Sequence, residues 1–209
     1  MWSSKIDQHY EIHNGLRICQ GDILRDTELV FLDDNNKRYN LYYPYIIVLS
    51  QDCDLMYGME GINIDPKSDS LVPMNQYLPN VLLAPAFREE DIKKGKHLIE
   101  QFRVEQESLN SDRMKIIRKN KNPRYHYLQG LQSAQIPELI IDFKHYITYP
   151  IKYTFDFYTK SYLATVNELF REDLSIRFCS YLARIGLPEL GTTKTDSSTN
   201  QAIGNCSEN

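Results

Sequence analysis

The chain of 209 residues lacks the short motifs that identify several large enzyme classes. It contains no P-loop, no GxGxxG and no GxSxG, which disfavours nucleotide hydrolysis, dinucleotide redox chemistry and α/β-hydrolase chemistry. Its histidines do not form the HExxH signature of a metalloprotease. We therefore expect no metal centre and no cofactor.

Long apolar runs and paired cysteines are also missing. No stretch approaches the roughly 18 apolar residues of a membrane span, and Met1 to Asp7 has no apolar core of signal-peptide length. We therefore expect a cytoplasmic protein with no membrane partner. The cysteines form no CxxC pair and are predicted to be reduced thiols: Cys19, Cys53, Cys179 and Cys206.

The composition otherwise suits a globular protein, with 42% hydrophobic and 25% charged residues. The net charge of −4 gives no general attraction to nucleic acid, so any such attraction must come from a local patch. Tyrosine is abundant, with 15 residues against 8 Phe and 1 Trp. Its apolar ring and polar tip suit half-buried positions and contact surfaces.

The apolar pattern predicts an α+β fold that is mainly β. Residues 21–55 indicate β structure, with a central strand at Tyr45–Leu49 that is buried on both faces. Gly58–Pro79 is polar and predicts a long loop, and 88–109 carries helix formers that Gly95 interrupts. Four further strands are expected: Val81–Pro85, which the proline ends, Tyr125–Leu128, Leu139–Phe143 and Tyr149–Tyr158.

The clearest predicted helix covers about 165–186. Apolar residues recur there at intervals of three and four, including Leu174 and Phe178, and form one stripe. Thr165 and Glu168 predict a capping box at its start. The stripe should pack on the β structure and complete its core.

A polar motif directly follows the buried strand, a position where scaffolds often present functional groups: Ser50, Gln51, Asp52, Cys53 and Asp54. Cys53 could be a nucleophile, the two aspartates could bind a divalent metal, or the motif could hydrogen-bond a ligand. Flanking carboxylates disfavour the thiolate that a nucleophilic cysteine needs, and one Asp-x-Asp is a weak metal signal. We favour a structural role, in which the carboxylates accept backbone N–H bonds in a turn and Cys53 packs inward.

The second candidate is the basic segment, residues 113–127. It carries six basic residues, no acid and two tyrosines: Arg113, Lys115, Arg118, Lys119, Lys121, Arg124, Tyr125 and Tyr127. This mixture is typical of single-stranded nucleic-acid binding, in which cations contact phosphates and rings stack on bases. A solvated loop whose charges keep a sheet edge from aggregating explains it equally well. His126 lies in this segment and joins Asp52 and Asp54 as a weak catalytic candidate.

Three stretches of the sequence resemble an uncharacterised bacterial family: Gly21–Leu24, Val48–Asp54 and Arg177–Pro188. The resemblance spans most of the chain and implies no reaction. More distantly, the early Gly-Asp-Ile and the later Val-Leu-Ser resemble the first strands of MazF/PemK-type toxins. Those toxins are small SH3-like barrels that cleave RNA without a metal, often as dimers paired with an antitoxin. Where they have Arg-Pro before the buried strand, this sequence has Tyr43-Pro44, so the arginine that would stabilise phosphate charge is missing.

We therefore expect a partly closed SH3-like barrel of MazF/PemK type with a mid-chain helical insertion and a C-terminal helix. Residues 1–190 should form one domain with a barrel core at about 15–160, and 191–209 should be a disordered tail. For function we expect a toxin-like or phage-defence accessory protein that binds RNA or single-stranded DNA, with or without catalysis. The alternatives are a metal-independent endoribonuclease and a protein-interaction module for a larger partner.

Overall fold

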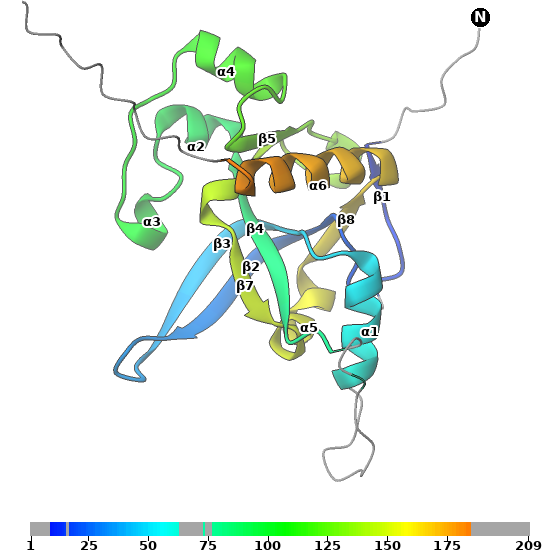
Figure 1. The fold of residues 1–209 in the computed structure, drawn as a ribbon. Coiled ribbons are helices and arrows are strands. Elements are labelled where there is room, and N and C mark those ends of the chain that lie inside the picture. Colours follow the sequence, from blue (N-terminus) through cyan, green and yellow to red (C-terminus); the bar gives the residue numbers. More distant parts are fainter. Residues whose placement is uncertain (1–8, 16, 63–72, 74–76, 185–209) are drawn as a thin grey trace, which may run out of the picture.

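A curled antiparallel sheet forms the body of the protein in a computed structural model, which describes residues 9–15, 17–62, 73 and 77–184. Its strands are β1 (Tyr10–Glu11), β2 (Asp22–Leu32), β3 (Arg38–Val48), β4 (Asn80–Arg88), β5 (Tyr125–Leu128), β6 (Leu139–Asp142), β7 (Ile147–Pro150) and β8 (Tyr162–Val166). They follow the order β1-β8-β2-β3-β4-β6-β5, with β7 also paired to β4. The expectation of an α+β fold that is mainly β and curls like part of a barrel is confirmed (Figure 1).

Helices cover both faces of this half-barrel. They are α1 (Asp52–Ile62), α2 (Glu89–Lys94), α3 (Ile99–Phe102), α4 (Ser111–Arg118), α5 (Ile151–Ser161) and α6 (Glu168–Leu182), with short 3-10 turns η2 (Gln132–Ala134) and η3 (Phe143–His145). Helix α6 lies across one end of the sheet, whereas α1 and α5 lie on another side (Figure 1). Helices α2, α3 and α4 form the expected mid-chain insertion between β4 and β5 in sequence; α4 contacts β5, and α2 contacts β4 and β6 (Figure 1).

The central strand was predicted correctly. In β3, the run from Tyr45 to Val48 is buried, with Ile46, Ile47 and Val48 fully so. Ile47 belongs to a core cluster that includes Leu174 and Phe178 of α6, while Ile46 belongs to a second cluster that includes Tyr158 of α5. Because alternate side chains enter two cores, the strand has no polar face, which explains the continuous apolar run.

The prediction that Pro85 ends its strand is wrong, because β4 continues to Arg88. On one side Pro85 pairs with Ile46 of β3. On the other side β4 pairs with β7 as far as Leu83 and with β6 only from Ala86 onward. The proline thus lies in the interval between two partner strands, where the N–H that it lacks is not needed for a ladder.

The predicted strand at Tyr149–Tyr158 is also wrong beyond residue 150, where helix α5 begins. Its buried residues are Ile151, Thr154 and Tyr158, which follow the three- and four-residue spacing of a helix. Pro150 occupies the N-cap position and suits a helix start. The alternation of bulky and polar residues seen in the sequence fits both periods, and tertiary packing decides for the helix.

The C-terminal helix exists but begins later than predicted, since α6 starts at Glu168 after the N-cap residue Asn167. The predicted capping box is wrong because Thr165 lies in β8. Within α6, Leu174 and Phe178 are buried in the core as expected. The stripe is narrower than predicted, with Leu169 and Leu182 about half exposed. The predicted tail at 191–209 lies outside the described residues.

The predictions of a loop at Gly58–Pro79 and of a helical region at 88–109 were partly right. Gly58–Pro79 is not a loop throughout, because α1 extends to Ile62; most of the residues beyond it lie outside the described ranges. Gly95 does interrupt the 88–109 region, since it ends α2 with a left-handed backbone (φ 72°). A Cβ at this position would come within 2.0 Å of the Gln106 carbonyl oxygen, so only glycine fits.

Candidate nucleic-acid interface

The basic segment begins on helix α4 and ends on strand β5. Asn110 caps α4 by accepting a hydrogen bond from the backbone N–H of Arg113 (2.9 Å). Met114 and Ile117 are buried against a third core cluster, which also holds Ile92 of α2. This packing turns the opposite face of α4 to the surface, so the basic side chains of the helix are exposed.

Three of the six basic residues are engaged with carboxylates. Arg118 forms two hydrogen bonds with Glu89, Arg124 forms two with Asp142 (2.8 and 2.6 Å), and Lys115 contacts Asp112 (3.1 Å). No carboxylate of the described residues pairs with the other three, which are exposed: Arg113, Lys119 and Lys121. The local positive charge available to a ligand is therefore about half of what the sequence indicated.

The buried carboxylate of Asp142 holds the Arg124 side chain in place. This carboxylate is fully buried, and the side chains of His97 and His145 approach it to 3.5 and 3.7 Å. Burial alone would raise the pKa of Asp142, but the hydrogen bonds from Arg124 prevail and hold it at about 2. The Arg124–Asp142 pair is thus ionised at neutral pH and fixes the guanidinium at one position.

Arg177 of α6 holds the turn between α4 and β5, and sequence reasoning did not assign it this role. Its guanidinium donates to the carbonyl oxygens of Asn120, Asn122 (2.9 Å) and Tyr125 (2.9 Å), and its Nε donates to His126 Nδ1 (3.1 Å). One side chain therefore satisfies three backbone acceptors and an imidazole. The signal in the sequence was its place in the resemblance motif at Arg177–Pro188.

The edge of β5 is blocked by a side chain rather than by repulsive charge. The Asn120 amide accepts from the Tyr127 N–H (2.6 Å) and donates to the Tyr127 carbonyl (3.3 Å), as a neighbouring strand would. Asn120 reaches this position with a left-handed backbone, φ 52°, which asparagine tolerates well. Such a cap prevents another strand from pairing here.

His126 is unsuited to acid–base catalysis in this structure. The residue is 3% exposed, and burial together with the positive charge of Arg177 lowers the pKa of His126 to about 3. Its Nδ1 already accepts a hydrogen bond from Arg177. No hydrogen bond or ion pair within the described ranges joins it to Asp52 or Asp54, so the three catalytic candidates do not form one site.

The two tyrosines differ in their availability. Tyr125 is 5% exposed, its hydroxyl donates to Gln106 (3.3 Å), and the Arg124 guanidinium lies 4.8 Å from its ring centre. Tyr127 is half-buried and donates to Glu138 (3.0 Å). Base stacking on Tyr125 would require its ring to be uncovered, so Tyr127 is the more accessible platform.

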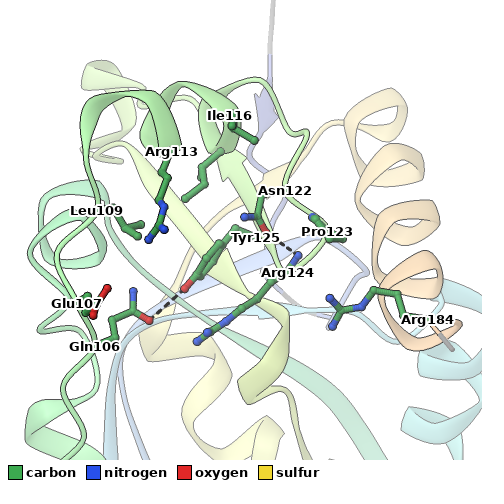
Figure 2. Close-up of a pocket in the computed structure, with 11 residues that line it drawn as sticks. Gln106, Glu107, Leu109, Arg113, Ile116, Asn122, Pro123, Arg124, Tyr125 and Arg184 are labelled. Atoms are coloured by element: carbon green, nitrogen blue, oxygen red, sulfur yellow. Dashed lines mark hydrogen bonds between the residues drawn. The ribbon is translucent and has the colours of Figure 1, made fainter. Parts of the chain in front are cut away.

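A pocket of about 600 Å³ lies beside the basic segment, and Figure 2 shows how its residues surround Tyr125. Arg113 approaches from α4, Arg124 lies beneath Tyr125, and Arg184 approaches from the chain that follows α6 (Figure 2). The Arg184 guanidinium stacks on the Tyr181 ring at 4.1 Å. The other lining residues mix amides, apolar groups and one acid: Gln106, Glu107, Leu109, Ile116, Ile117, Asn122 and Pro123.

The polar motif at 50–54 begins a helix rather than a turn. Ser50 Oγ accepts a hydrogen bond from the Leu82 N–H (2.8 Å), and Asp52, the first residue of α1, accepts one from the Gln20 N–H (2.6 Å). Cys53 and Asp54 are exposed, so the prediction that Cys53 packs inward is wrong. The contacts of Ser50 and Asp52 support the structural role that the sequence favoured, but Asp54 accepts no backbone N–H bond from the described residues, so that part of the prediction is wrong.

Gln20, directly before the first of the three stretches, connects the second stretch to helix α6. Its side-chain amide donates to the Leu49 carbonyl (3.1 Å) and to Ser175 Oγ (3.0 Å) of α6. Arg171 of α6 approaches both the Gln20 carbonyl (3.3 Å) and the Asp52 carboxylate (3.2 Å). Gln20, Leu49, Asp52 and two residues of α6 that precede the third stretch, Arg171 and Ser175, therefore form a polar junction between the start of β2, α1 and α6.

Asp22 anchors the same region from inside. The carboxylate is fully buried and accepts hydrogen bonds from the Cys19 N–H (2.6 Å), Tyr158 (2.7 Å) and Thr165 (2.6 Å), with His13 Nε2 at 3.1 Å. Burial raises the pKa of Asp22, against the effect of these bonds. His13, Cys19 and Asp22 have ligand-type atoms within 4.8 Å of one another. Because four donors already occupy the carboxylate, we interpret the group as a structural lock.

Replacing Asp52 with alanine should lower the free energy of unfolding by about 1–2 kcal/mol, because the Gln20 N–H and Arg171 lose their acceptor. Asp52→Asn keeps an oxygen acceptor and should cost less. Asp54→Asn, at an exposed position, is the matched control and should change stability by less than about 0.5 kcal/mol. Chemical denaturation measures all three. An unchanged stability in Asp52→Ala would contradict the structural role.

Comparison with protein-family models and with curated proteins finds no match for this chain. Across the described residues, none of the helices has both the length and the apolar character needed to cross a membrane.

Proposed function

We propose that the protein binds single-stranded nucleic acid, RNA or DNA, through the basic segment and the pocket beside it. This proposal rests on one observation: the pocket beside the basic segment is lined by Arg113, Arg124 and Arg184 with a single carboxylate, Glu107. A volume of about 600 Å³ is in the range of small-ligand sites. Arginine forks suit phosphate, and apolar residues such as Ile116 and Pro123 suit a base or sugar.

The exposed cations favour phosphate contacts on both sides of the turn between α4 and β5. Arg113 and Arg184 flank Tyr125 in the pocket (Figure 2), and Lys119 and Lys121 extend the positive surface along the turn. Arg177 and Asp142 fix this surface beforehand, which lowers the entropic cost of binding. We further propose that the half-barrel is SH3-like and of MazF/PemK type, and that the protein is a toxin-like or phage-defence accessory; both extensions depend on the sequence resemblance.

Replacing Arg113, Lys119 and Lys121 with alanine together should weaken binding to any single-stranded sequence. Each phosphate contact contributes about −0.7 to the log–log salt slope on a single strand, so the slope should become shallower by about 2. Fluorescence anisotropy with a labelled oligonucleotide across a salt series measures both effects.

The matched control removes the same charge elsewhere, with Lys37 and Arg38 at the β2–β3 turn and Lys152 on α5 replaced by alanine. This triple variant should keep the wild-type slope. If both triple variants bind equally weakly, the loss comes from the lower net charge of the protein and not from the basic segment. The proposal is overturned if the wild-type protein does not bind the oligonucleotide at low salt.

A second candidate function is a protein-interaction module. It is favoured by exposed apolar side chains on the projecting β2–β3 hairpin and on α5, among them Leu32 (63% exposed), Tyr39 (45%) and Tyr153 (54%). Aromatic residues of this kind are common at protein interfaces. This function becomes the favoured one if the wild-type protein shows no binding in the nucleic-acid titration.

A further inference from the structure

A second hollow, of about 550 Å³, lies over strands β2, β3 and β4, away from the basic segment. We call it the sheet pocket; its lining residues are Arg25, Asp26, Tyr45, Arg88, Gln132, Gln135, Ile136 and Pro137. It shares no residue with the pocket of about 600 Å³ beside the basic segment. We propose that the sheet pocket binds the phosphate group of a small organic phosphate.

The register of the sheet places its key side chains on one face. Arg25 of β2 is opposite Tyr45 of β3, and Tyr45 is opposite Ala86 of β4. Arg88 follows Ala86 by two residues, so its side chain leaves the same face. Two arginines from different strands therefore flank one tyrosine in a position that the fold fixes.

The pocket is rich in hydrogen-bond donors that lack protein partners. Tyr45 is 4% exposed as a residue, and its hydroxyl makes no hydrogen bond within the described part of the chain. The hydroxyl oxygen is not among the fully buried polar atoms, so a ligand in the pocket can reach it. No carboxylate of the described residues pairs with Arg88, which is exposed, and the amides of Gln132 and Gln135 add further donors.

Two lining residues adopt a left-handed backbone although neither is glycine. Asp26 has φ 53° and Gln135 has φ 55°. Such conformations cost energy and cluster at functional sites. The Asp26 carboxylate accepts a hydrogen bond from the Tyr42 hydroxyl (2.5 Å) and lies 3.4 Å from Arg25 Nε. That contact involves only the Nε of Arg25, so its terminal nitrogens remain available at the rim of the pocket.

The arrangement of donors favours phosphate over carboxylate. Donors approach from β2, from β3 and from the end of β4, and a phosphate monoester offers three terminal oxygens in different directions, whereas a carboxylate offers two in one plane. Two arginines against one aspartate leave a net positive charge, which suits an anion. A neighbouring pocket of about 420 Å³ also contains Arg25 and Asp26 and extends to Phe157 and Lys160. It gives room for the organic part of the phosphate ligand.

The test is a heteronuclear NMR titration of the full chain with two probes, inorganic phosphate and adenosine monophosphate. We expect the side-chain N–H signals of Arg25, Arg88, Gln132 and Gln135 to shift with both. Arg88→Ala should weaken binding by about tenfold or more, the effect of losing a hydrogen bond to a charged group. Tyr45→Phe, which removes the hydroxyl and keeps the ring, should weaken it without loss of stability. Tighter binding of the nucleotide would show that the organic part also contacts the site.

Two controls separate this site from the nucleic-acid interface. Arg38→Ala, on the β2–β3 hairpin and outside both pockets, should leave binding of the probes unchanged. Arg113→Ala should weaken oligonucleotide binding but not the shifts at Arg25 and Arg88. The proposal is overturned if neither probe shifts these signals at about 10 mM, or if Arg38→Ala weakens binding as much as Arg88→Ala does.

Discussion

Replacing Arg177 with alanine should lower the free energy of unfolding by about 3 kcal/mol, the sum of several moderate hydrogen-bond losses. The carbonyl oxygens of Asn120, Asn122 and Tyr125 and the Nδ1 of His126 would all lose their donor. Water can reach part of this region, because Arg177 is half-buried, so the loss should be smaller than for a fully buried network. Urea denaturation gives the value directly.

The same substitution should also weaken nucleic-acid binding, because Arg177 holds the turn that carries Lys119 and Lys121. Arg177→Lys, which keeps the charge but can supply fewer directed bonds, should be intermediate in stability. Arg184→Ala is the matched control from the same region: it removes an exposed arginine that stacks on Tyr181, and should change stability by less than about 1 kcal/mol. If Arg184→Ala proves as destabilising as Arg177→Ala, the bonds of Arg177 do not hold the turn.

Local sequence patterns predicted the structure correctly where a pattern is compatible with only one kind of element. The apolar run at Tyr45–Val48 fits only a strand buried on both sides of the sheet, and Gly95 ends a helix because its backbone conformation excludes a Cβ. The pattern at 149–158 had two solutions. Bulky residues at every second position suit a strand, but Ile151 and Tyr158, seven positions apart, also lie on one helical face, and the core beneath α5 selects that arrangement.

The charge of the basic segment could not be evaluated from the sequence, because two of its three carboxylate partners lie elsewhere in the chain; only Asp112 directly precedes the segment. Glu89 precedes Arg118 by 29 positions, and Asp142 follows Arg124 by 18. Six cations without an acid among them therefore indicated a more positive surface than the folded chain presents. The sequence does not reveal the donors of the sheet pocket for the same reason, since Arg25, Tyr45 and Arg88 are neighbours only through strand pairing.

At the polar junction the sequence showed which residues form motifs, but it did not show what these residues contact. The stretches Gly21–Leu24, Val48–Asp54 and Arg177–Pro188 each appeared as separate motifs. In the structure, Asp22 of the first stretch bonds to Thr165 of β8, and the preceding residue, Gln20, bonds to Asp52 of the second stretch and to Ser175 of α6, which lies before the third stretch. Polar motifs at strand ends indicate function in many proteins, but here their bonds satisfy backbone groups and join elements.

Acidification should destabilise the protein steeply, and His126 should be a principal cause. Burial and the nearby Arg177 guanidinium lower the pKa of His126 in the folded protein to about 3, below the ordinary value of 6.5. A histidine with a depressed folded pKa is neutral in the fold and protonated more readily in the unfolded chain. Its contribution to stability is therefore complete above about pH 6.5 and is lost as the pH falls towards 3, at up to about 1.4 kcal/mol per pH unit.

His126→Gln should flatten this dependence between about pH 6 and 4, because glutamine does not titrate and can still offer an oxygen to Arg177. Asp142, with a pKa lowered to about 2, loses its own contribution only below about pH 4, so the two effects occupy different windows. Urea denaturation at a series of pH values measures the slopes, and the imidazole ¹⁵N shifts of His126 report its protonation directly. A His126 that becomes protonated near pH 6 in the folded protein, or a variant with the wild-type slope, would show that the imidazole is not held neutral by its burial against Arg177.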